Sequence, residues 1–358
     1  MQVTKTGICL LVCLFLSQLA NASLDYDVLK LPAAKSHLAA KSLVYSVEKF
    51  GDRVFATGHR GHIVYSDDLG ETWTQAEVPV RVGILDIFFV NAEKGWAVGH
   101  GGVILHSSDG GKTWEKQYDG YRFGNEGLDY YQKASAANPE SEMLEYLIGE
   151  MEYAIDQGAD KPFFKVYFHD ENLGYAFGAY GIIVKTEDGG KTWTHTMHNV
   201  ENYNFYHLFD YTPMTNGKFL LNGEAGLIFN ASVEDDYAKL IENTPYEGSF
   251  FTSSSAKDGS LVVGGLRGFT FVSHDFGETW VESKKPPTGS VVDSTTLADG
   301  RLVLVTMTGD VLVSTDSGDT FARAKTPRVG PIFAVEEVSP GALLVAGPLG
   351  IIKIPLSQ

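Results

Sequence analysis

The chain has 358 residues, with 28 Lys and Arg against 45 Asp and Glu, which gives a formal net charge of −17 at pH 7. This acidic balance argues against nucleic acid or an anionic lipid surface as a partner, because both are negatively charged. Both cysteines, Cys9 and Cys13, lie within the first 22 residues, so the rest of the chain has no thiol to form a disulfide.

The first 22 residues have the features of a secretory signal peptide. Lys5 supplies a positive start, Gly7–Leu16 form a short apolar core, and Ala20-Asn21-Ala22 is a small-residue cleavage site. The apolar run is too short to span a bilayer comfortably. We therefore expect cleavage near Ala22, export to a bacterial periplasm, and one mature domain over residues 23–358.

One eight-residue motif, Ser/Thr-x-Asp-x-Gly-x-Thr-Trp/Phe, recurs five times in this mature part. Each copy follows an apolar run such as Val103-Ile104-Leu105, so it is a hairpin turn leaving a strand. This is the Asp-box, in which Asp accepts backbone N–H bonds, Gly takes a backbone conformation closed to other residues, and the aromatic ring packs beneath. We expect a structural role for its Asp and aromatic residues, which are Asp68, Trp73, Asp109, Trp114, Asp188, Trp193, Asp275, Trp280, Asp316 and Phe321.

A second signature, a Gly-x-x-Gly-like turn between two apolar strands, lies upstream of each box. Its second glycine recurs at positions 61, 102, 181, 226, 268, 309 and 350, so most steps are close to 41 residues. Repeats of this length with about four short strands each are typical of propeller blades. The sequence therefore predicts an all-β fold, a seven-bladed β-propeller in which two blades lack a readable Asp-box.

The two ends of the chain suggest how the ring closes. The seventh repeat stops at Ile351-Ile352-Lys353-Ile354 without an outer strand, whereas intact blades end that strand in Pro, as at Val78-Pro79. The segment Tyr26–Pro32 has the same alternation and the same Pro. Because a propeller must hide its last sheet edges, we expect this N-terminal strand to complete blade seven.

One interval breaks the repeat. From Gly102 to Gly181 is 79 residues, and the surplus maps to about residues 119–161. Its first part is rich in aromatic residues and glycine. From Asn138-Pro139-Glu140 onward, apolar residues at three- and four-residue spacing alternate with acidic ones, which predicts an amphipathic helix with Pro in its first turn. Because this insertion follows an outer strand, it should lie on the face of the Gly-x-x-Gly turns, opposite the Asp-boxes.

That face is the candidate binding surface, since loops on a rigid scaffold usually carry binding residues. The plain alternative is that each of its polar residues is only a solvated turn residue. For the face as a whole the insertion favours a function, because it is costly to maintain as decoration. The turns, the interblade loops and the insertion place on it His59, Arg60, Arg81, His100, Arg122, Tyr180, Glu224, Arg267 and Arg328.

Catalysis is a weaker interpretation of the same residues. Sialidases also carry Asp-boxes, but they need three arginines around the substrate, a Tyr nucleophile activated by Glu, and an Asp acid. No Tyr–Glu arrangement of this kind stands out in the sequence. General hydrolysis by paired carboxylates would require Asp86, Asp210 or Glu224 to meet in the channel.

Metal binding is the other weaker interpretation. His59 and His100 occupy equivalent turns of neighbouring blades, where a metal ion could be held between them. Each His is more often a simple polar turn residue. We therefore expect no catalytic residues, no metal and no cofactor.

Two phrases in the sequence resemble a known family. They are Gly95-Trp96-Ala97-Val98-Gly99-His100-Gly101-Gly102-Val103-Ile104, which runs into an Asp-box, and Gly174-Tyr175-Ala176-Phe177-Gly178. Over almost the whole mature chain the sequence resembles the photosystem II stability/assembly factor family. The resemblance implies a seven-bladed Asp-box propeller that acts without catalysis, binding lumenal or periplasmic segments of a membrane protein through an arginine-bearing face. The positions that match this role are Arg60, Arg81, Arg122, Arg267 and Arg328.

Three functions remain open at this point. The first is a periplasmic, non-enzymatic scaffold, assembly or accessory factor for a membrane-protein complex. Relatives in non-photosynthetic bacteria resemble accessory proteins of resistance-nodulation-division type exporters, so such an exporter is the expected partner. The alternatives are a carbohydrate-active propeller, either a sialidase-like hydrolase or a glycan binder, and a photosystem II assembly factor proper. We expect a monomer that has no membrane span of its own.

Overall fold

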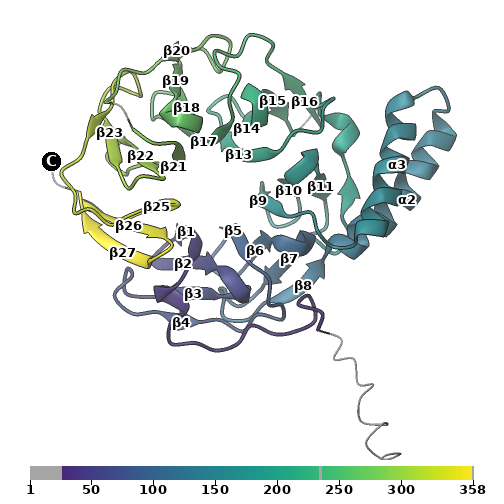
Figure 1. Ribbon diagram of the computed structural model, residues 1–358, viewed down its shortest axis with the longest axis horizontal. Helices are drawn as coiled ribbons and strands as arrows, with labels where there is room; N and C mark the ends of the chain where they lie inside the picture. Colours follow the sequence, from purple (N-terminus) through teal and green to yellow (C-terminus); the bar gives the residue numbers. More distant parts are fainter. Residues whose placement is uncertain (1–25, 234–235, 287, 357–358) are drawn as a thin grey trace, which may run out of the picture.

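The computed structural model describes residues 26–233, 236–286 and 288–356. Seven antiparallel sheets are arranged around a central axis as the blades of a propeller (Figure 1). Six of these sheets have four strands and the last has three. The predicted seven-bladed propeller is therefore confirmed. The expected signal peptide at residues 1–22 lies outside the described residues, and within them no helix is long and apolar enough to cross a membrane.

Within each blade the strands follow one another outward, and the first strand lines the channel. Blades 1 to 4 consist of β1 (Val44–Phe50), β2 (Arg53–Gly58), β3 (Ile63–Ser66) and β4 (Thr74–Gln75); β5 (Ile84–Phe89), β6 (Gly95–Gly99), β7 (Val103–Ser107) and β8 (Glu115–Tyr118); β9 (Phe163–Phe168), β10 (Gly174–Gly178), β11 (Ile183–Thr186) and β12 (Thr194–His195); β13 (Leu208–Pro213), β14 (Phe219–Gly223), β15 (Ile228–Ser232) and β16 (Tyr237–Leu240). Blades 5 to 7 consist of β17 (Phe250–Ser255), β18 (Leu261–Gly265), β19 (Thr270–Ser273) and β20 (Val281–Glu282); β21 (Val291–Thr296), β22 (Leu302–Thr306), β23 (Val311–Ser314) and β24 (Ala322–Arg323); β25 (Ala334–Ser339), β26 (Ala342–Gly347) and β27 (Gly350–Pro355).

The Asp-boxes connect the third and fourth strands of blades 1, 2, 3, 5 and 6, as expected. In blade 2 the Asp109 carboxylate accepts hydrogen bonds from the Thr113 N–H at 3.0 Å and from the Thr113 hydroxyl at 2.7 Å. The Ser107 hydroxyl accepts the N–H of Gly111 at 2.9 Å, and Gly111 has a φ of 78°, which favours glycine. The box thus satisfies backbone donors of its own turn.

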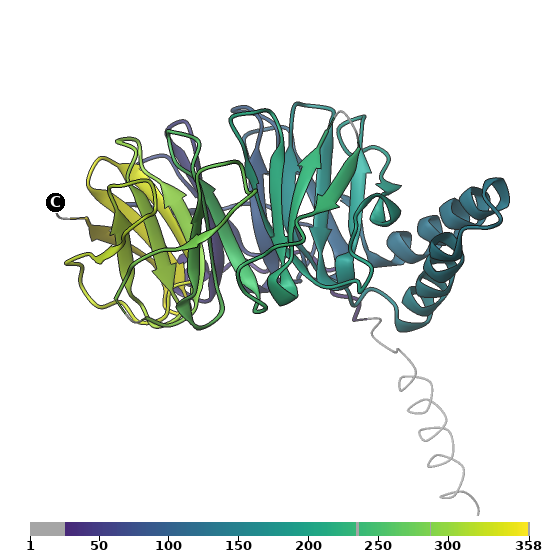
Figure 2. The same ribbon diagram turned by 90° about the horizontal axis from the view of Figure 1, so that it is seen from above.

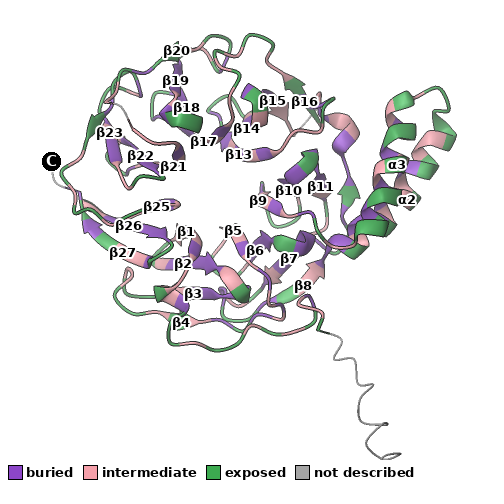
Figure 3. Cartoon of the chain, in the orientation of Figure 1, coloured by how far each residue is buried: buried purple, intermediate pink, exposed green. Residues whose placement is uncertain are grey.

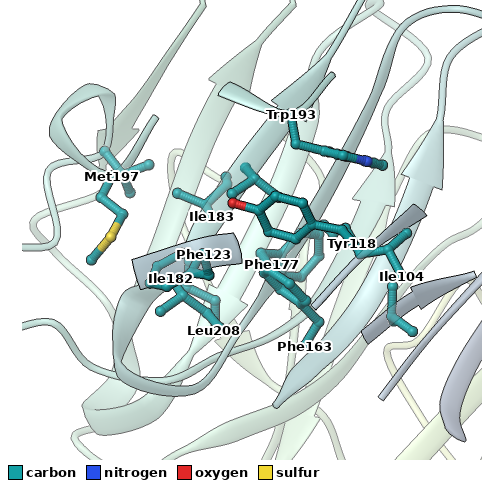
Figure 4. Close-up of a cluster of buried hydrophobic side chains, with 14 of the residues drawn as sticks. Ile104, Tyr118, Phe123, Phe163, Phe177, Ile182, Ile183, Trp193, Met197 and Leu208 are labelled. Atoms are coloured by element: carbon teal, nitrogen blue, oxygen red, sulfur yellow. The ribbon is translucent and has the colours of Figure 1, made fainter. Parts of the chain in front are cut away.

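The aromatic residue of each box fills the gap between its own blade and the preceding one. Trp193 of blade 3 is 4% exposed and lies over Tyr118 of blade 2, with 6.4 Å between ring centroids (Figure 4). Trp114 of blade 2 shares a buried cluster with Phe55 and Ile63 of blade 1. The blades therefore stack through apolar clusters that span neighbouring sheets.

The prediction that the N-terminal segment completes blade seven is wrong. Residues 26–32 form no strand, and the seventh sheet contains only β25, β26 and β27. The segment instead lies along blades 1 and 2: the Val28 carbonyl accepts the Arg81 N–H at 2.8 Å, and Leu29 is 4% exposed within the cluster shared by these blades. The apolar–polar alternation and the Pro of this segment did not determine where it lies. Its position follows from the buried contacts of Leu29, which are made at the junction of blades 1 and 2.

The ring closes by packing between blade 7 and blade 1. Leu344 and Ala346 of blade 7 share a buried cluster with Val44, Val54 and Val64 of blade 1. The Lys353 amine on β27 also pairs with Glu71 of the first Asp-box at 2.6 Å. Closure therefore depends on side-chain packing rather than on a strand shared by the two ends of the chain.

The insertion contains two helices, α2 (Gly120–Ala137) and α3 (Glu142–Gln157), where we expected one. Ser141 caps α3 by accepting the Leu144 N–H at 3.4 Å, so this helix begins after Pro139 rather than at it. Helix α2 was missed because of its glycines. A Cβ on Gly127 would lie 2.4 Å from the Met151 sulfur, so the glycine permits close packing of the two helices.

The helical hairpin starts and ends on the face that we expected. The backbones of Gly120 and Lys161 lie against the turn at Gly102, since a Cβ on Gly102 would be 2.9 Å from the Gly120 nitrogen and 3.3 Å from the Lys161 carbonyl. From there the hairpin projects outward beside blade 3 (Figures 1 and 2), where Phe123 packs on His195 with 4.6 Å between ring centroids. Many of its outward residues are exposed (Figure 3). The hairpin therefore flanks the propeller and leaves the channel mouth uncovered.

Candidate functional site

The predicted face is built from turns that join the second and third strands of the blades. Five of them are short 3-10 helical turns whose middle residue has left-handed backbone, with φ of 58° at Arg60, 54° at Tyr180 and 57° at Arg267. Each turn ends in glycine because there is no room for a side chain. A Cβ on Gly61, for example, would lie 2.1 Å from the Val80 carbonyl oxygen of the next interblade loop. The turns are thus seated on those loops, and the face presents a fixed set of side chains.

Three of the five predicted arginines are available to a partner. Arg60, Arg267 and Arg328 are exposed, and none has an ion-pair partner among the described residues. They lie on blade 1, on blade 5 and in the loop between blades 6 and 7. These positions place positive charge along one side of a face on an otherwise acidic protein.

The other two arginines have internal partners. The Arg81 guanidinium donates to the Pro32 carbonyl at 2.9 and 3.0 Å, and so holds the N-terminal segment in place. Arg122 donates to Glu126 at 2.6 Å and to the Gln117 carbonyl, and its guanidinium lies 5.0 Å from the centre of the Tyr118 ring. Both have a structural role, which sequence spacing could not distinguish from exposure.

Tyr180 and Glu224, two further predicted residues, are brought together by His207. The Tyr180 ring is 53% exposed and lies edge-on to the His207 ring at 4.9 Å, and His207 Nδ1 accepts the Tyr180 N–H at 3.1 Å. Glu224 accepts the His207 N–H at 3.2 Å. No signal in the sequence pointed to His207, because it precedes an inner strand at a position with no motif.

His59 and His100 are less informative. The His59 ring lies 3.2 Å from the Leu43 carbonyl and 5.3 Å from the His62 ring, and His100 is exposed next to Gly83. Among the described residues, no group of three or more His, Cys, Asp or Glu side chains is arranged to hold a metal ion.

A ring of apolar side chains surrounds the channel just below these turns. The second residue of each inner strand, or its equivalent in blade 7, is apolar or aromatic and half-buried: Tyr45, Leu85, Phe164, Phe209, Phe251, Val292 and Phe333. In blades 1 to 5 the preceding residue pairs with the glycine that starts the turn, as Ile84 does with Gly99. This set, the apolar collar, was not predicted, although the recurrence of an apolar residue at one register position was visible in the sequence.

The collar is most aromatic in blades 3 to 5. Phe164 and Phe209 stack with 5.7 Å between centroids, and Phe209 meets Phe251 edge-on at 5.2 Å. His207 lies 5.9 Å from both Phe164 and Phe209, so the collar is continuous with Tyr180 on the rim. The face therefore combines exposed arginines with a half-exposed aromatic wall.

Below the collar the channel is polar and mostly acidic. The Lys165 amine lies between two carboxylates, 3.4 Å from Asp86 and 3.5 Å from Asp210. A second oxygen of each carboxylate accepts a backbone N–H from the next blade, Val166 at 3.1 Å for Asp86 and Ser253 at 2.9 Å for Asp210. Asp293 does the same with the Val335 N–H at 2.8 Å. These aspartates thus connect the inner strands of neighbouring blades.

The charges in the channel influence one another. Burial alone would lower the pKa of the Lys165 amine, but the Asp86 and Asp210 carboxylates raise it well above its usual value, so Lys165 is charged. Burial and nearby carboxylates raise the pKa of Glu48 to about 8, and burial raises that of Asp293 to about 7. The Glu48 and Asp293 carboxyl groups are therefore at least partly protonated near neutral pH.

Asp86 and Asp210 do approach one another, as paired-carboxylate hydrolysis would require, but Lys165 and two backbone N–H groups occupy their oxygens. Glu224 is on the rim with His207 instead. The geometry accounts for the channel carboxylates as structural groups between blades.

A family model described as "Photosynthesis system II assembly factor YCF48" matches residues 65–140 and 150–330, which is more than half of the sequence. The chain belongs to this family. No curated protein sequence matches it.

Solved structures agree on the fold of this family member. A structure described as "YCF48 bound to D1 peptide" aligns with a TM-score of 0.61 at 14% identity and covers 93% of this chain and 100% of that one. YCF48 from Cyanidioschyzon merolae aligns at 0.62 and 14% identity, covering 91% and 98%. Virginiamycin B lyase from Staphylococcus aureus, an enzyme by its name, aligns at 0.65 and 10% identity, covering 88% and 96%. At such identities the likeness extends to the propeller fold alone.

Proposed function

We propose that this protein is a non-enzymatic assembly or accessory factor that binds an extended segment of a membrane-protein complex at the face bearing the Gly-x-x-Gly turns. The observation that carries the proposal is the pairing of free arginines, Arg60, Arg267 and Arg328, with the apolar collar on one rigid face. Membership of an assembly-factor family supports it, and so does the fold shared with a YCF48 protein that was solved with a bound D1 peptide.

The chemistry of this face suggests what the bound segment contains. Guanidinium groups favour carboxylates, with which they form paired hydrogen bonds. The half-exposed rings of Phe164, Phe209 and Phe251 favour an apolar or aromatic side chain that enters the channel mouth. We therefore expect an extended segment that combines acidic groups with an apolar residue.

The site of action that we propose is the periplasm, with a resistance-nodulation-division type exporter as the partner complex. The apolar, small-residue pattern of the first 22 residues supports export. N-terminal sequencing of the protein purified from its own cells should begin near Ser23. An intact Met1 would refute the periplasmic location without affecting the peptide-binding face.

Charge reversal on the two faces tests the binding proposal. Arg60→Glu/Arg267→Glu changes the proposed face, whereas Lys112→Glu/Lys191→Glu changes exposed Asp-box residues on the opposite face by the same net charge. Cross-linking in intact cells should capture a periplasmic segment of a membrane complex with the wild type and with the lysine variant. The arginine variant should lose it.

A synthetic peptide of the captured segment should then bind the purified wild type at least about tenfold more tightly than the arginine variant, a difference of ~1.4 kcal/mol. Equal binding by the two variants would rule out the proposed face. Capture of photosystem II would favour an assembly factor proper. Turnover of glycosides that an Asp86 substitution abolishes would favour a carbohydrate-active propeller instead.

A further inference from the structure

Blade 4 has a complete set of four strands but lacks the aromatic residue of an Asp-box. In every blade with a box, the third-strand residue three positions after the second glycine of the turn pairs with one outer-strand residue. The box aromatic lies two residues before that outer-strand residue. Trp193, for instance, lies two before His195, which pairs with Val184. In blade 4 the equivalent pair is Phe229 and Leu240. The residue two before Leu240 is Ala238, so blade 4 carries alanine where the blades with a box carry Trp or Phe.

The missing ring leaves a space between blades 3 and 4. A slot of about 80 Å³ opens there, and Ala238 and Ala231 form part of its wall. On the blade 3 side it is lined by Tyr175 and Ile183, which occupy the strand positions that Trp96 and Ile104 hold beside Trp193 in the preceding gap. The slot therefore corresponds to the place of a box indole. Blade 7, which also lacks a box, has no outer strand among the described residues, and buried aliphatic side chains fill its gap with blade 6.

The walls of the slot are aromatic. Tyr167, Tyr211 and Phe219 lie within 4.5 to 6.1 Å of one another, measured between ring centroids. Phe177 adds a fourth ring, edge-on to Tyr211 at 5.9 Å. Rings at these separations present both faces and edges to a planar guest, which is the geometry that aromatic groups prefer.

One edge of the slot carries a carboxylate. The Asp236 side chain lines it and accepts hydrogen bonds from the Tyr175 hydroxyl at 3.3 Å and from the Asn199 amide at 3.2 Å, and it pairs with the Lys185 amine at 3.2 Å. In two of the boxes the indole N–H donates to a backbone carbonyl: Trp114 to Gly111 at 3.1 Å and Trp280 to Gly277 at 3.0 Å. An N–H donor on a ring in the slot could use the lone pair of the Asp236 carboxylate that these three partners leave available.

From these observations we propose that the gap between blades 3 and 4 is a binding slot for a free, planar aromatic molecule that carries an N–H donor, of the size of indole. The occupant is a small molecule rather than a partner's side chain, because the slot is recessed between sheets and lies on the Asp-box side, away from the turn face. This inference does not depend on the proposed function.

Titration with indole, followed by calorimetry and by ligand-observed NMR, tests the proposal. Indole should bind the wild type saturably in the millimolar range or tighter, as is usual for a fragment of this size. Ala238→Trp, which restores the ring from within, should weaken binding at least about tenfold. Ala231→Leu narrows the slot with less change and serves if the tryptophan variant folds poorly. Ala322→Trp, on the exposed outer strand of blade 6, is the matched control and should bind as the wild type does.

Two further ligands separate the alternatives. Benzothiophene has nearly the shape of indole without the N–H, so it should bind more weakly; equal binding would refute the role of the donor. N-acetyltryptophanamide carries a peptide backbone, and tighter binding of this compound than of indole would mean that a partner's tryptophan is the occupant, against the proposal. If indole does not bind the wild type, or binds the Ala238→Trp variant equally, the slot is a packing gap and the proposal is wrong.

Discussion

The two signature residues of an Asp-box contribute to stability in different environments. The Asp109 carboxylate satisfies donors of its own turn, but those donors lie at the surface, where water can replace it. Trp114 is 6% exposed and packs edge-on to Phe89 with 6.0 Å between ring centroids. Of the two residues, the aromatic one therefore contributes more to blade stacking, and the Asp mainly fixes the shape of the turn.

Trp114→Ala should lower the free energy of unfolding by about 3–5 kcal/mol, because it removes a large buried ring and leaves a cavity. Asp109→Ala should cost only about 0.5–1.5 kcal/mol, the usual net value of hydrogen bonds at an accessible site. Urea unfolding of both variants measures the two costs. Similar losses for the two would show that the turn, rather than the ring, holds blade 2.

The channel carboxyls make stability depend on pH. The pKa of Glu48, raised to about 8, and that of Asp293, raised to about 7, exceed the values expected in the unfolded chain. The folded protein then binds more protons than the unfolded one, so stability is present at low pH and is lost as the pH rises through these values. Between pH 7 and pH 9 we expect a loss on the order of 1 kcal/mol, reduced by water in the channel.

Thermal unfolding across this pH range measures the effect, and the matched variant is Glu48→Gln, which cannot titrate. The melting temperature of the wild type should fall as the pH rises, and that of the variant should fall less. A wild type that becomes more stable toward pH 9 would contradict the raised pKa values.

At the scale of elements, the N-terminal segment illustrates how a correct local pattern can lead to a wrong position. Tyr26–Pro32 alternates like an outer strand, yet Leu29 is buried between blades 1 and 2 and the segment makes its hydrogen bonds there. The helical hairpin shows the opposite case: its location followed from blade topology, whereas α2 was hidden by glycines that exist for close contact with α3 and blade 3.

Truncation of the chain up to Lys35 should destabilise the propeller by about 2–3 kcal/mol, chiefly through loss of the buried Leu29 side chain. The remaining blades should still unfold in one cooperative transition, because no sheet loses a strand. Chemical denaturation followed by fluorescence gives both quantities, with Tyr26→Ala, at a residue 66% exposed, as the neutral control. Loss of the cooperative transition would indicate that the segment closes the ring after all.

At the scale of the whole molecule, the propeller has two different faces and one seam, where the ring closes between blades 7 and 1. The Asp-boxes hold the sheets on one rim, while the opposite rim presents free arginines above the apolar collar. Within the part of the chain that the structure describes, blades 7 and 1 share no strand, and their seam relies on the apolar cluster around Leu344 and on the pair of Lys353 with Glu71.

Hydrogen exchange should therefore find blade 7 less protected than blade 2, because blade 7 has three strands and borders the seam. Mass spectrometry of exchanged peptides from β25–β27 and from β5–β8 makes the comparison within one molecule. Equal protection of the two blades would mean that ring closure is as strong as the other blade interfaces.

The sequence by itself determined the features that depend on local, repeated chemistry. Box and turn motifs recur because each blade needs the same hairpin and the same seated glycine, so blade number, Asp-box roles and the face of the insertion could all be read from spacing. The tertiary structure decided what depends on contacts between distant residues: that Arg81 and Arg122 are bound internally, that the collar is continuous through His207, and that Leu29 packs beside blade 2. It also showed that Ala238 lies in a gap that Trp or Phe fills in the blades with a box, since the register of two strands, rather than any motif, identifies that position.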